Sequence, residues 1–253
     1  MPAYHARPAL LNDRVILVTG AGDGIGRAAA KAFAAHGATV ILLGKTIKKL
    51  EKVYDDIVAA GHPQPAIYPM NLEGAGPDHY AELAETLDRE FGRLDGLLHN
   101  AAWLGSITPL EHYPADQWLR VLHINLNAPF LLTQALMPVL RKSDAASVVF
   151  TSSGVGRKGR AYWGAYAVSK FGIEGLAQVL ADEVETNTAI RVNCLNPGAT
   201  RTQMRAQAFP GEDPATLPSA EDIMPAYLYL MGPDSKAVRG QSLDARDYMT
   251  RIL

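Results

Sequence analysis

The chain has 253 residues, of which 48% are hydrophobic and 20% are charged, and its formal net charge is -2. This length suffices for one α/β domain with a buried core, so we expect a single domain over residues 1–253. The near-zero charge argues against a nucleic-acid or membrane-surface binder, and a single cysteine forms no internal disulfide and suggests the cytoplasm.

The first predicted unit is a strand, a glycine-rich turn and a helix. Residues 15–19 are a short apolar run, and residues 25–36 have the alanine-rich composition of a helix. The turn between them contains Gly20, Gly24 and Gly26. Glycines at these positions would let the backbone approach a phosphate at the positive N-terminus of the helix. Their spacing differs from G-x-G-x-x-G, so the strand-to-helix context carries the prediction.

The same alternation continues along the chain and predicts the fold. Helical periods occur at 48–60, 78–91, 115–141, 163–185 and 220–231. Strands are predicted at 39–43, 66–70, 96–99, 147–151 and 190–195, with a last one near Ser242. We therefore predict a doubly wound, Rossmann-like parallel sheet of about seven strands with helices on both faces. The proline-rich segment 206–218 is predicted as a loop, either a lid or a plain connection.

Three side chains in the second half are candidates for acid/base chemistry. Tyr166 and Lys170 are four residues apart in a predicted helix, so they lie on one face. Ser153 follows the strand at 147–151, at the edge where open α/β sheets bind ligands. A free tyrosine has a pKa of about 10, and a nearby cation lowers it toward the useful range. We predict that Lys170 does so, although an isolated Tyr-x-x-x-Lys is more often a solvated pair.

Six motifs in order resemble the short-chain dehydrogenase/reductase superfamily over nearly the whole chain. Additional segments, including Trp163-Gly-Ala-Tyr, are similar to bacterial YciK-type oxidoreductases. The resemblance implies a nicotinamide cofactor and the interconversion of a carbonyl and an alcohol by hydride transfer. The six motifs are Thr19-Gly-Ala-Gly-Asp-Gly-Ile-Gly26, Asn100-Ala-Ala102, Asn125, Ser153, Tyr166-Ala-Val-Ser-Lys170 and Asn196-Pro-Gly-Ala-Thr-Arg-Thr202.

The resemblance also implies a role for each candidate residue. Tyr166 would donate or accept the proton, and Ser153 would bind the substrate oxygen. Lys170 would lower the tyrosine pKa and bind the nicotinamide ribose, while Asn125 would hold a water in the proton relay. The cofactor would lie along Gly20, Gly22, Asp23, Gly24, Ile25, Gly26, Gly44, Lys45, Asn71, Leu72, Asn100, Ala101, Ala102, Tyr166, Lys170, Pro197, Gly198, Thr200 and Thr202.

The end of the second strand favours NADP over NAD. An acidic residue there would accept both ribose hydroxyls and select NAD, but the position is Gly44, and Lys45 follows. The ammonium of Lys45 can meet a 2'-phosphate as a point charge. Asp23 argues against NADP, because NADP-binding relatives often have a basic residue at that position of the turn. We predict NADP as the preferred cofactor and leave NAD open.

Three departures from the family pattern affect the predicted cleft. Ala102 stands where the family usually has glycine, so we expect a small shift of the cofactor. Asn71 replaces a frequent acidic residue, but its carbonyl oxygen can still meet the adenine amino group. The usual Asp-Gly-Gly is absent near the C-terminus, so the family pattern does not predict which residues form that wall of the pocket.

Substrate identity is the least determined part of the sequence prediction. Trp103, Trp163 and Met204 would border the pocket and suggest an apolar or ring-bearing carbonyl compound. Arg157 and its basic neighbours could attract an anionic group or simply be solvated. The alternative function is a non-catalytic NADP-binding sensor, and the chain is too short for a sugar-nucleotide epimerase. We expect a homodimer or homotetramer through the helices at 115–141 and 163–185, with no metal, nucleic acid or membrane partner.

Overall fold

The computed structural model describes residues 3–249, which form a seven-stranded parallel sheet. The strand order is β3-β2-β1-β4-β5-β6-β7, so the chain begins in the middle, builds one side, and returns to build the other. This is the predicted doubly wound, Rossmann-like topology. The strands are β1 (Val15–Thr19), β2 (Thr39–Gly44), β3 (Ala66–Pro69), β4 (Gly96–His99), β5 (Ser147–Thr151), β6 (Arg191–Asn196) and β7 (Ser242–Asp244).

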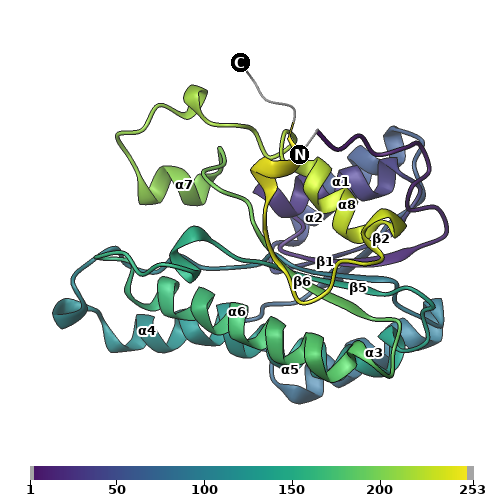
Figure 1. Ribbon diagram of the computed structural model, residues 1–253, viewed down its shortest axis with the longest axis horizontal. Helices are drawn as coiled ribbons and strands as arrows, with labels where there is room; N and C mark the ends of the chain where they lie inside the picture. Colours follow the sequence, from purple (N-terminus) through teal and green to yellow (C-terminus); the bar gives the residue numbers. More distant parts are fainter. Residues whose placement is uncertain (1–2, 250–253) are drawn as a thin grey trace.

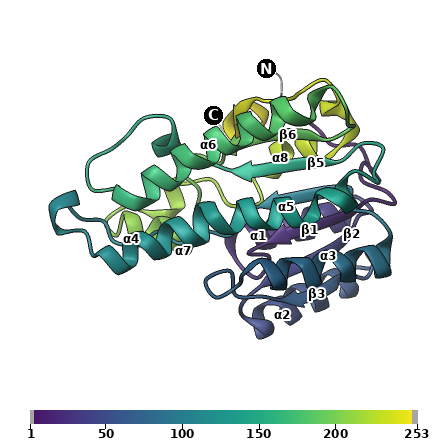
Figure 2. The ribbon, with the colours of Figure 1, turned by 90° about the horizontal axis from the view of Figure 1, so that it is seen from below.

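Helices cover both faces of the sheet (Figure 1). α1, α2 and α8 lie on one face, and α3, α4, α5 and α6 lie on the other. Viewed from below, α6, α5 and α3 run side by side (Figure 2). The helices are α1 (Gly24–Ala35), α2 (Ile47–Ala59), α3 (Pro77–Phe91), α4 (Ala115–Leu122), α5 (Ala128–Leu140), α6 (Gly164–Glu185), α7 (Gln203–Ala208) and α8 (Met224–Met231).

Alternation along the central strand separates two apolar cores. All five residues of β1 are buried. Ile16 and Val18 pack with α1 and α8, whereas Val15 and Leu17 pack with α3, α5 and α6. Successive side chains of a strand point to opposite faces, so a continuous apolar run is what a sheet covered on both sides requires. These two cores fix the sheet and leave its carboxyl edge free for a site.

The ends of β1 and β4 are joined by one hydroxyl group at the point where the strand order reverses. The backbone amides of Asn100 and Ala101 both donate to Thr19 Oγ1, at 2.9 and 3.0 Å. That hydroxyl donates in turn to the Leu98 carbonyl at 3.2 Å. Open α/β sheets bind ligands at this reversal point, and Thr19 holds its two sides at a fixed separation.

The single helix predicted at 115–141 is two helices joined by the π-helical turn η2 (His123–Asn127). The amide of Ala128 donates to the His123 carbonyl, which is a bond across five residues instead of four. Such turns widen a helix and are frequent at functional sites. The sequence shows an unbroken helical period here, so periodicity alone did not reveal the turn.

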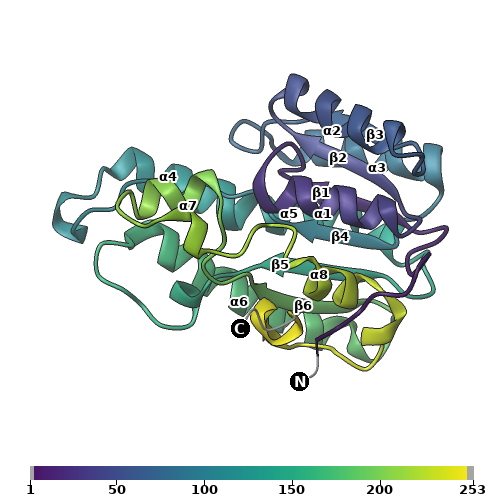
Figure 3. The same cartoon turned by 90° about the horizontal axis from the view of Figure 1, so that it is seen from above.

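The segment predicted as a loop at 206–218 is partly helical. It begins inside α7 and contains a short 3-10 turn, η4 (Pro214–Thr216). Viewed from above, α7 lies beyond the carboxyl ends of the strands (Figure 3), on the opposite side of the sheet from α4 (Figure 1). The segment therefore stands next to the edge of the sheet where the site is expected.

Among residues 3–249, no helix combines the length and apolar character needed to cross a membrane. Over the same residues, histidine, cysteine and carboxylate side chains form no group of three that could hold a metal ion.

Candidate functional site

Two adjoining hollows form a cleft along the carboxyl edge of the sheet. We call them the inner hollow, of about 370 Å³, and the outer hollow, of about 340 Å³. Ser153, Tyr166 and Lys170 line the inner hollow, and Gly44 and Lys45 line the outer one. Both share the walls made by Gly20, Asp23, Ala101, Ala102, Trp103 and Gln203.

The glycine-rich turn is packed so closely that side chains would not fit in it. A Cβ at Gly26 would lie 2.2 Å from the Gly20 carbonyl oxygen and 2.6 Å from Asn100 Nδ2, so only glycine fits. Gly20 and Gly24 have φ values of +68° and +49°, in the left-handed region that favours glycine. The turn brings the bare backbone to the N-terminus of α1, as a phosphate-binding cradle requires.

Asp23 and Asn100 hold this turn in place. Asp23 Oδ1 accepts the amide of Gly24 at 2.7 Å and so caps α1. Asn100 Nδ2 donates to the Thr19 carbonyl at 3.3 Å and occupies the space that Gly20 and Gly26 leave free. Asp23 therefore shapes the wall that the two hollows share, and Asn100 shapes the inner hollow.

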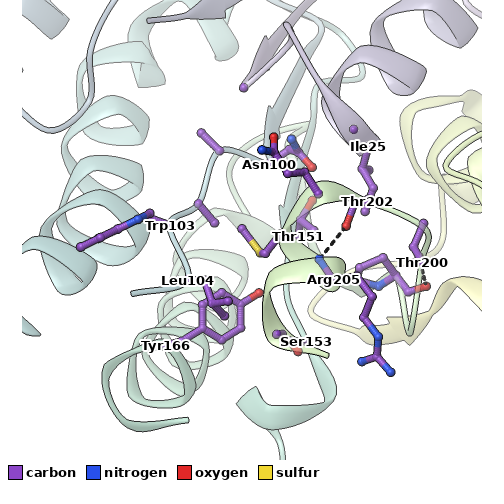
Figure 4. Close-up of a pocket in the computed structure, with 18 of the residues that line it drawn as sticks. Ile25, Asn100, Trp103, Leu104, Thr151, Ser153, Tyr166, Thr200, Thr202 and Arg205 are labelled. Atoms are coloured by element: carbon purple, nitrogen blue, oxygen red, sulfur yellow. Dashed lines mark hydrogen bonds between the residues drawn. The ribbon is translucent and has the colours of Figure 1, made fainter. Parts of the chain in front are cut away.

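Tyr166 and Ser153 meet in the inner hollow (Figure 4). Tyr166 is 8% exposed, and burial raises its pKa to about 12, while a hydrogen bond with the Ser153 hydroxyl acts in the opposite direction. A phenol in this state is protonated at neutral pH. The inner hollow thus contains a neutral proton donor beside a hydroxyl group.

Lys170 lies one turn after Tyr166 in α6, and both side chains are buried. Its Nζ donates to the Thr151 carbonyl at 2.7 Å and is 5.5 Å from the centre of the Tyr166 ring. The pKa of Tyr166 is raised by burial, and Ser153 rather than Lys170 opposes that rise. Burial also lowers the pKa of Lys170 to about 8. Burial therefore dominates the pKa of Tyr166 in this structure, and the lowering of that pKa by Lys170 stays a prediction.

Asn125 is buried in the π-helical turn, and its amide is fully engaged. Its Oδ1 accepts the backbone amide of Trp103 at 2.8 Å, and its Nδ2 donates to the Trp103 carbonyl at 2.9 Å and to Ser169 Oγ at 3.1 Å. The side chain thereby fixes the segment that follows β4 to α6. A role in a proton relay stays a prediction.

The loop after β6 closes the inner hollow. Pro197, Gly198, Thr200 and Thr202 all line it, and their contact with a cofactor stays a prediction. Thr202 caps α7, because its hydroxyl oxygen accepts the amide of Arg205 at 3.2 Å (Figure 4). This cap fixes α7, whose residues Met204 and Ala208 also line the hollow.

The outer hollow contains charged residues that sequence reasoning missed. Lys49, in the first turn of α2, forms a salt bridge of 2.5 Å with Asp23. Arg120 forms a salt bridge of 2.7 Å with Glu73 and lies 4.2 Å from the centre of the Trp103 ring. Lys49 could have been found from its place in the helix that follows Lys45. Arg120 and Glu73 come from distant segments, so no local pattern signals them.

Residues 14–213 match the family model described as short chain dehydrogenase. The chain belongs to this family. It is 52% identical over 243 residues to the oxidoreductase YciK of Escherichia coli (strain K12), covering 96% of each chain. A solved short chain dehydrogenase from Pseudomonas syringae has a TM-score of 0.95 and 60% identity, covering 97% of this chain and 99% of its own. Another, from Shigella flexneri and complexed with NADP, has a TM-score of 0.93 and 53% identity, covering 95% and 100%.

In this short chain dehydrogenase, Arg157 does not face the substrate side of the cleft. Its guanidinium donates to Asp244 Oδ2 at 2.8 Å, to Ser242 Oγ at 2.9 Å and to the Leu243 carbonyl at 2.9 Å. The suggestion that Arg157 attracts a substrate anion is therefore wrong, because β7 takes up all three of its nitrogens. That partner strand is remote in sequence.

The segment after α7 is held over the inner hollow by one arginine. Arg205 donates two hydrogen bonds of 2.6 Å to the Glu212 carboxylate, and its guanidinium carbon lies 3.7 Å from the centre of the Phe209 ring. Phe209 packs at 5.8 Å from Trp163, which itself lies 5.7 Å from Tyr166. This short chain dehydrogenase thus has an ordered cover over the inner hollow, and whether it opens as a lid stays a prediction.

Proposed function

We propose that this oxidoreductase is an NADP-preferring enzyme that interconverts a carbonyl compound and the corresponding alcohol, with Tyr166 as the general acid and base. The observation that carries the proposal is the meeting of Tyr166, Ser153 and Lys170 in one buried hollow that continues into a glycine-lined, basic one. The assembled acid/base set gives no support to the non-catalytic sensor. When bound, the nicotinamide cofactor would supply or accept the hydride.

Each catalytic candidate has a task that its surroundings support. Because burial raises the pKa of Tyr166 to about 12, the phenol is protonated at neutral pH and holds a proton that it can donate to a carbonyl oxygen. Ser153 would orient that oxygen by a hydrogen bond. The reverse reaction needs the phenolate, which the nearby Lys170 ammonium would favour by its charge.

The residues that would hold the cofactor fit a phosphorylated dinucleotide. The turn from Gly20 to Gly26 would take the pyrophosphate at the N-terminus of α1, since its glycines permit the left-handed backbone and the close packing that shape this turn. Gly44 carries no carboxylate to repel a 2'-phosphate, and Lys45 lies beside it in the outer hollow. The Shigella flexneri relative complexed with NADP supports the same preference.

The inner hollow supports an apolar, ring-bearing substrate. Trp163, Leu104 and Met204 line it around Tyr166 and Ser153. Flat, weakly polar surfaces of this kind favour a cyclic or aromatic ketone over a small hydrophilic one. We propose a cyclic ketone, or the matching secondary alcohol, as the substrate class.

A screen with both cofactors tests the proposal. Cyclohexanone, an aromatic ketone and a 3-ketosteroid would each be incubated with the protein and NADPH or NADH, and the loss of absorbance at 340 nm followed. We expect turnover with at least one cyclic ketone and tighter binding of NADPH than of NADH in fluorescence titration. Tighter binding of NADH would overturn the cofactor preference. Binding of NADPH with no turnover of any carbonyl compound would overturn the catalytic role.

We also propose that the chain forms a homodimer or homotetramer, in the cytoplasm, through α5 and α6. Phe130 on α5 is 45% exposed, and so are Val168 and Phe171 on α6, while Val179 is 58% exposed. Several large apolar side chains on neighbouring helices are typical of a subunit contact. Light scattering should give a mass at least twice the 27.3 kDa of one chain, and Phe171→Lys should lower it.

A further inference from the structure

Two residues one turn apart on α6 hold two consecutive residues at the end of β5. The Lys170 ammonium donates to the Thr151 carbonyl at 2.7 Å, and the Ser152 hydroxyl donates to the Glu174 carboxylate at 2.5 Å. We propose that Glu174 is a positioning residue: with Lys170 it clamps the end of β5 to α6, so that Ser153 and Lys170 face the same part of the inner hollow. This inference rests on the proposed function, in which those two residues act together.

The residues of the clamp are buried, and their polar groups have hydrogen-bond partners. Glu174 is 7% exposed, Ser152 is 1% exposed and Lys170 is 3% exposed. A buried carboxylate is costly unless polar partners surround it, and Glu174 has the Ser152 hydroxyl and the Arg157 guanidinium, whose Nε lies 3.5 Å from Oε1. An apolar residue at this position of the helix would avoid that cost. One of these partners, Ser152, is the immediate neighbour of the catalytic candidate Ser153.

A second arm connects the clamp to the opposite wall of the cleft. Arg157, which contacts Glu174, also donates to Asp244 in β7 at 2.8 Å. The other carboxylate oxygen of Asp244 accepts Asn196 Nδ2 at 2.6 Å, and Asn196 Oδ1 accepts the amide of Gly198 at 3.0 Å. Gly198 lines the inner hollow. One chain of contacts therefore joins both sides of the cleft to Glu174.

The turn between Ser153 and Arg157 fits against Lys170 with no spare room. A Cβ at Gly156 would lie 2.8 Å from the Cβ of Lys170 and 2.9 Å from its carbonyl oxygen. The Gly156 amide donates to the Ser153 carbonyl at 2.9 Å. A displacement of this turn would therefore be transmitted directly to both Ser153 and Lys170.

The charge of Glu174 acts on Lys170 as well. The titratable groups that face Lys170 are Tyr166 and Glu174 from α6, Cys194 from β6 and His99 from β4, and Arg157 from the turn after β5 contacts Glu174. Burial lowers the pKa of Lys170 to about 8, and Cys194 and Glu174 oppose that change. Because burial raises the pKa of the Cys194 thiol well above its usual range, Glu174 is the group that supplies negative charge at neutral pH. Removing this charge should lower the pH at which Lys170 loses its proton.

Glu174→Gln tests the inference without requiring turnover. The protein would be labelled with ε-¹³C-lysine and titrated by NMR with and without NADPH, with the Lys170 signal assigned from Lys170→Met. We expect the midpoint of Lys170 to fall by about one pH unit in Glu174→Gln, and Glu174→Asp, which keeps the charge, to restore part of it. Glu183→Gln is the matched control, since Glu183 is exposed on the same helix and should leave the midpoint unchanged.

Ser152→Ala tests the clamp itself, and it also serves if Glu174→Gln fails to fold. This variant keeps the charge of Glu174 and removes only the hydroxyl group, so Lys170 should titrate as in the natural chain. Hydrogen exchange of the Gly156 amide should accelerate by at least about tenfold, because the turn is no longer fixed. With a ketone found in the screen, kcat should fall on the order of tenfold while the KM for NADPH changes little.

Two results would overturn the inference. One is a folded Glu174→Gln whose Lys170 midpoint equals that of Glu183→Gln. The other is a Ser152→Ala protein with unchanged exchange at Gly156. If the screen finds no substrate, the proposed function fails, but the titration and exchange measurements still decide the role of Glu174.

Discussion

The outer and inner hollows of the cleft contain charges of two different kinds. In the outer hollow, the salt bridge between Lys49 and Asp23 has side chains that are 50% and 52% exposed. In the inner hollow, Tyr166 and Lys170 are 8% and 3% exposed. Exposed pairs contribute little and are screened by salt, whereas burial by itself shifts the pKa values of Tyr166 and Lys170. Substitutions in the outer hollow should therefore have small effects on cofactor binding. Substitutions in the inner hollow should have large effects on the acid/base chemistry.

The largest expected effect is at Tyr166, in the inner hollow. Tyr166→Phe removes the proposed proton donor and should lower kcat for ketone reduction by about 10²- to 10⁴-fold, with the affinity for NADPH nearly unchanged. Tyr162→Phe is the matched control, because Tyr162 is 58% exposed and lies four residues earlier. Steady-state kinetics and fluorescence titration measure the two quantities. Equal losses in both variants would remove the distinction between the buried and the exposed phenol.

His99, buried at the end of β4, tests whether burial of an ionisable group also governs stability. It is fully desolvated, and its pKa is lowered to about 3 by burial and by Lys170. The Thr133 hydroxyl donates to the Pro129 carbonyl, so its oxygen accepts His99 Nε2–H at 2.8 Å and holds the neutral ring. The unfolded chain binds a proton near pH 6.5 and the folded protein does not, so stability is full above that pH and is lost as the pH falls toward 3.

The free energy of unfolding should decrease by up to about 1.4 kcal/mol per pH unit below 6.5 because of His99. Urea unfolding at pH 7, 6 and 5 measures this slope. His99→Gln should show a shallower slope, and His112→Gln, which changes a histidine that is 71% exposed, should not. Identical slopes in all three proteins would show that burial of His99 carries no such cost.

The predicted effect in the outer hollow is smaller and confined to one cofactor. Lys45→Ala should weaken NADPH binding about tenfold, as loss of one charge-assisted hydrogen bond does, and leave NADH binding unchanged. Lys48→Ala is the control, since Lys48 is an exposed neighbour that does not line the hollow. Equal weakening for both cofactors would mean that Lys45 does not meet the 2'-phosphate.

The smallest effect is expected at Asp23. Asp23→Asn keeps the cap of α1, because asparagine is as good a capping residue, and frees Lys49 from its salt bridge. NADPH should then bind about threefold more tightly at low salt, with the gain lost at high salt. Titrations at two ionic strengths measure it, and a gain independent of salt would contradict an electrostatic cause.

Local patterns predicted the layout of the fold well, because apolar residues recur with a single period along each helix and each strand. The apolar run of β1 and the alanine-rich α1 were evident from residue types alone, and both lie within a residue or two of the predicted bounds. Backbone features without a residue signature were missed. The π-helical turn at His123–Asn127 interrupts an apolar period that reads as continuous.

The site was predictable where a motif is local and not where contacts are long-range. The positions of Tyr166 and Ser153 follow from a helix and a strand end, and the structure brings them together. The pKa of Tyr166 could not be predicted, because it depends on burial by segments far along the chain. Glu174 gave no signal either, since its partners Ser152 and Arg157 become neighbours only in the folded sheet.

The π-helical turn has a consequence for insertions and deletions. It places one more residue between α4 and α5 than a regular helix would hold, and Asn125 reaches Trp103 from that position. Deleting one residue from this stretch would permit an uninterrupted helix, but it would rotate everything on one side by roughly 100° relative to the other. The amide would leave Trp103, so a change of length by a single residue here should be tolerated far less well than most substitutions.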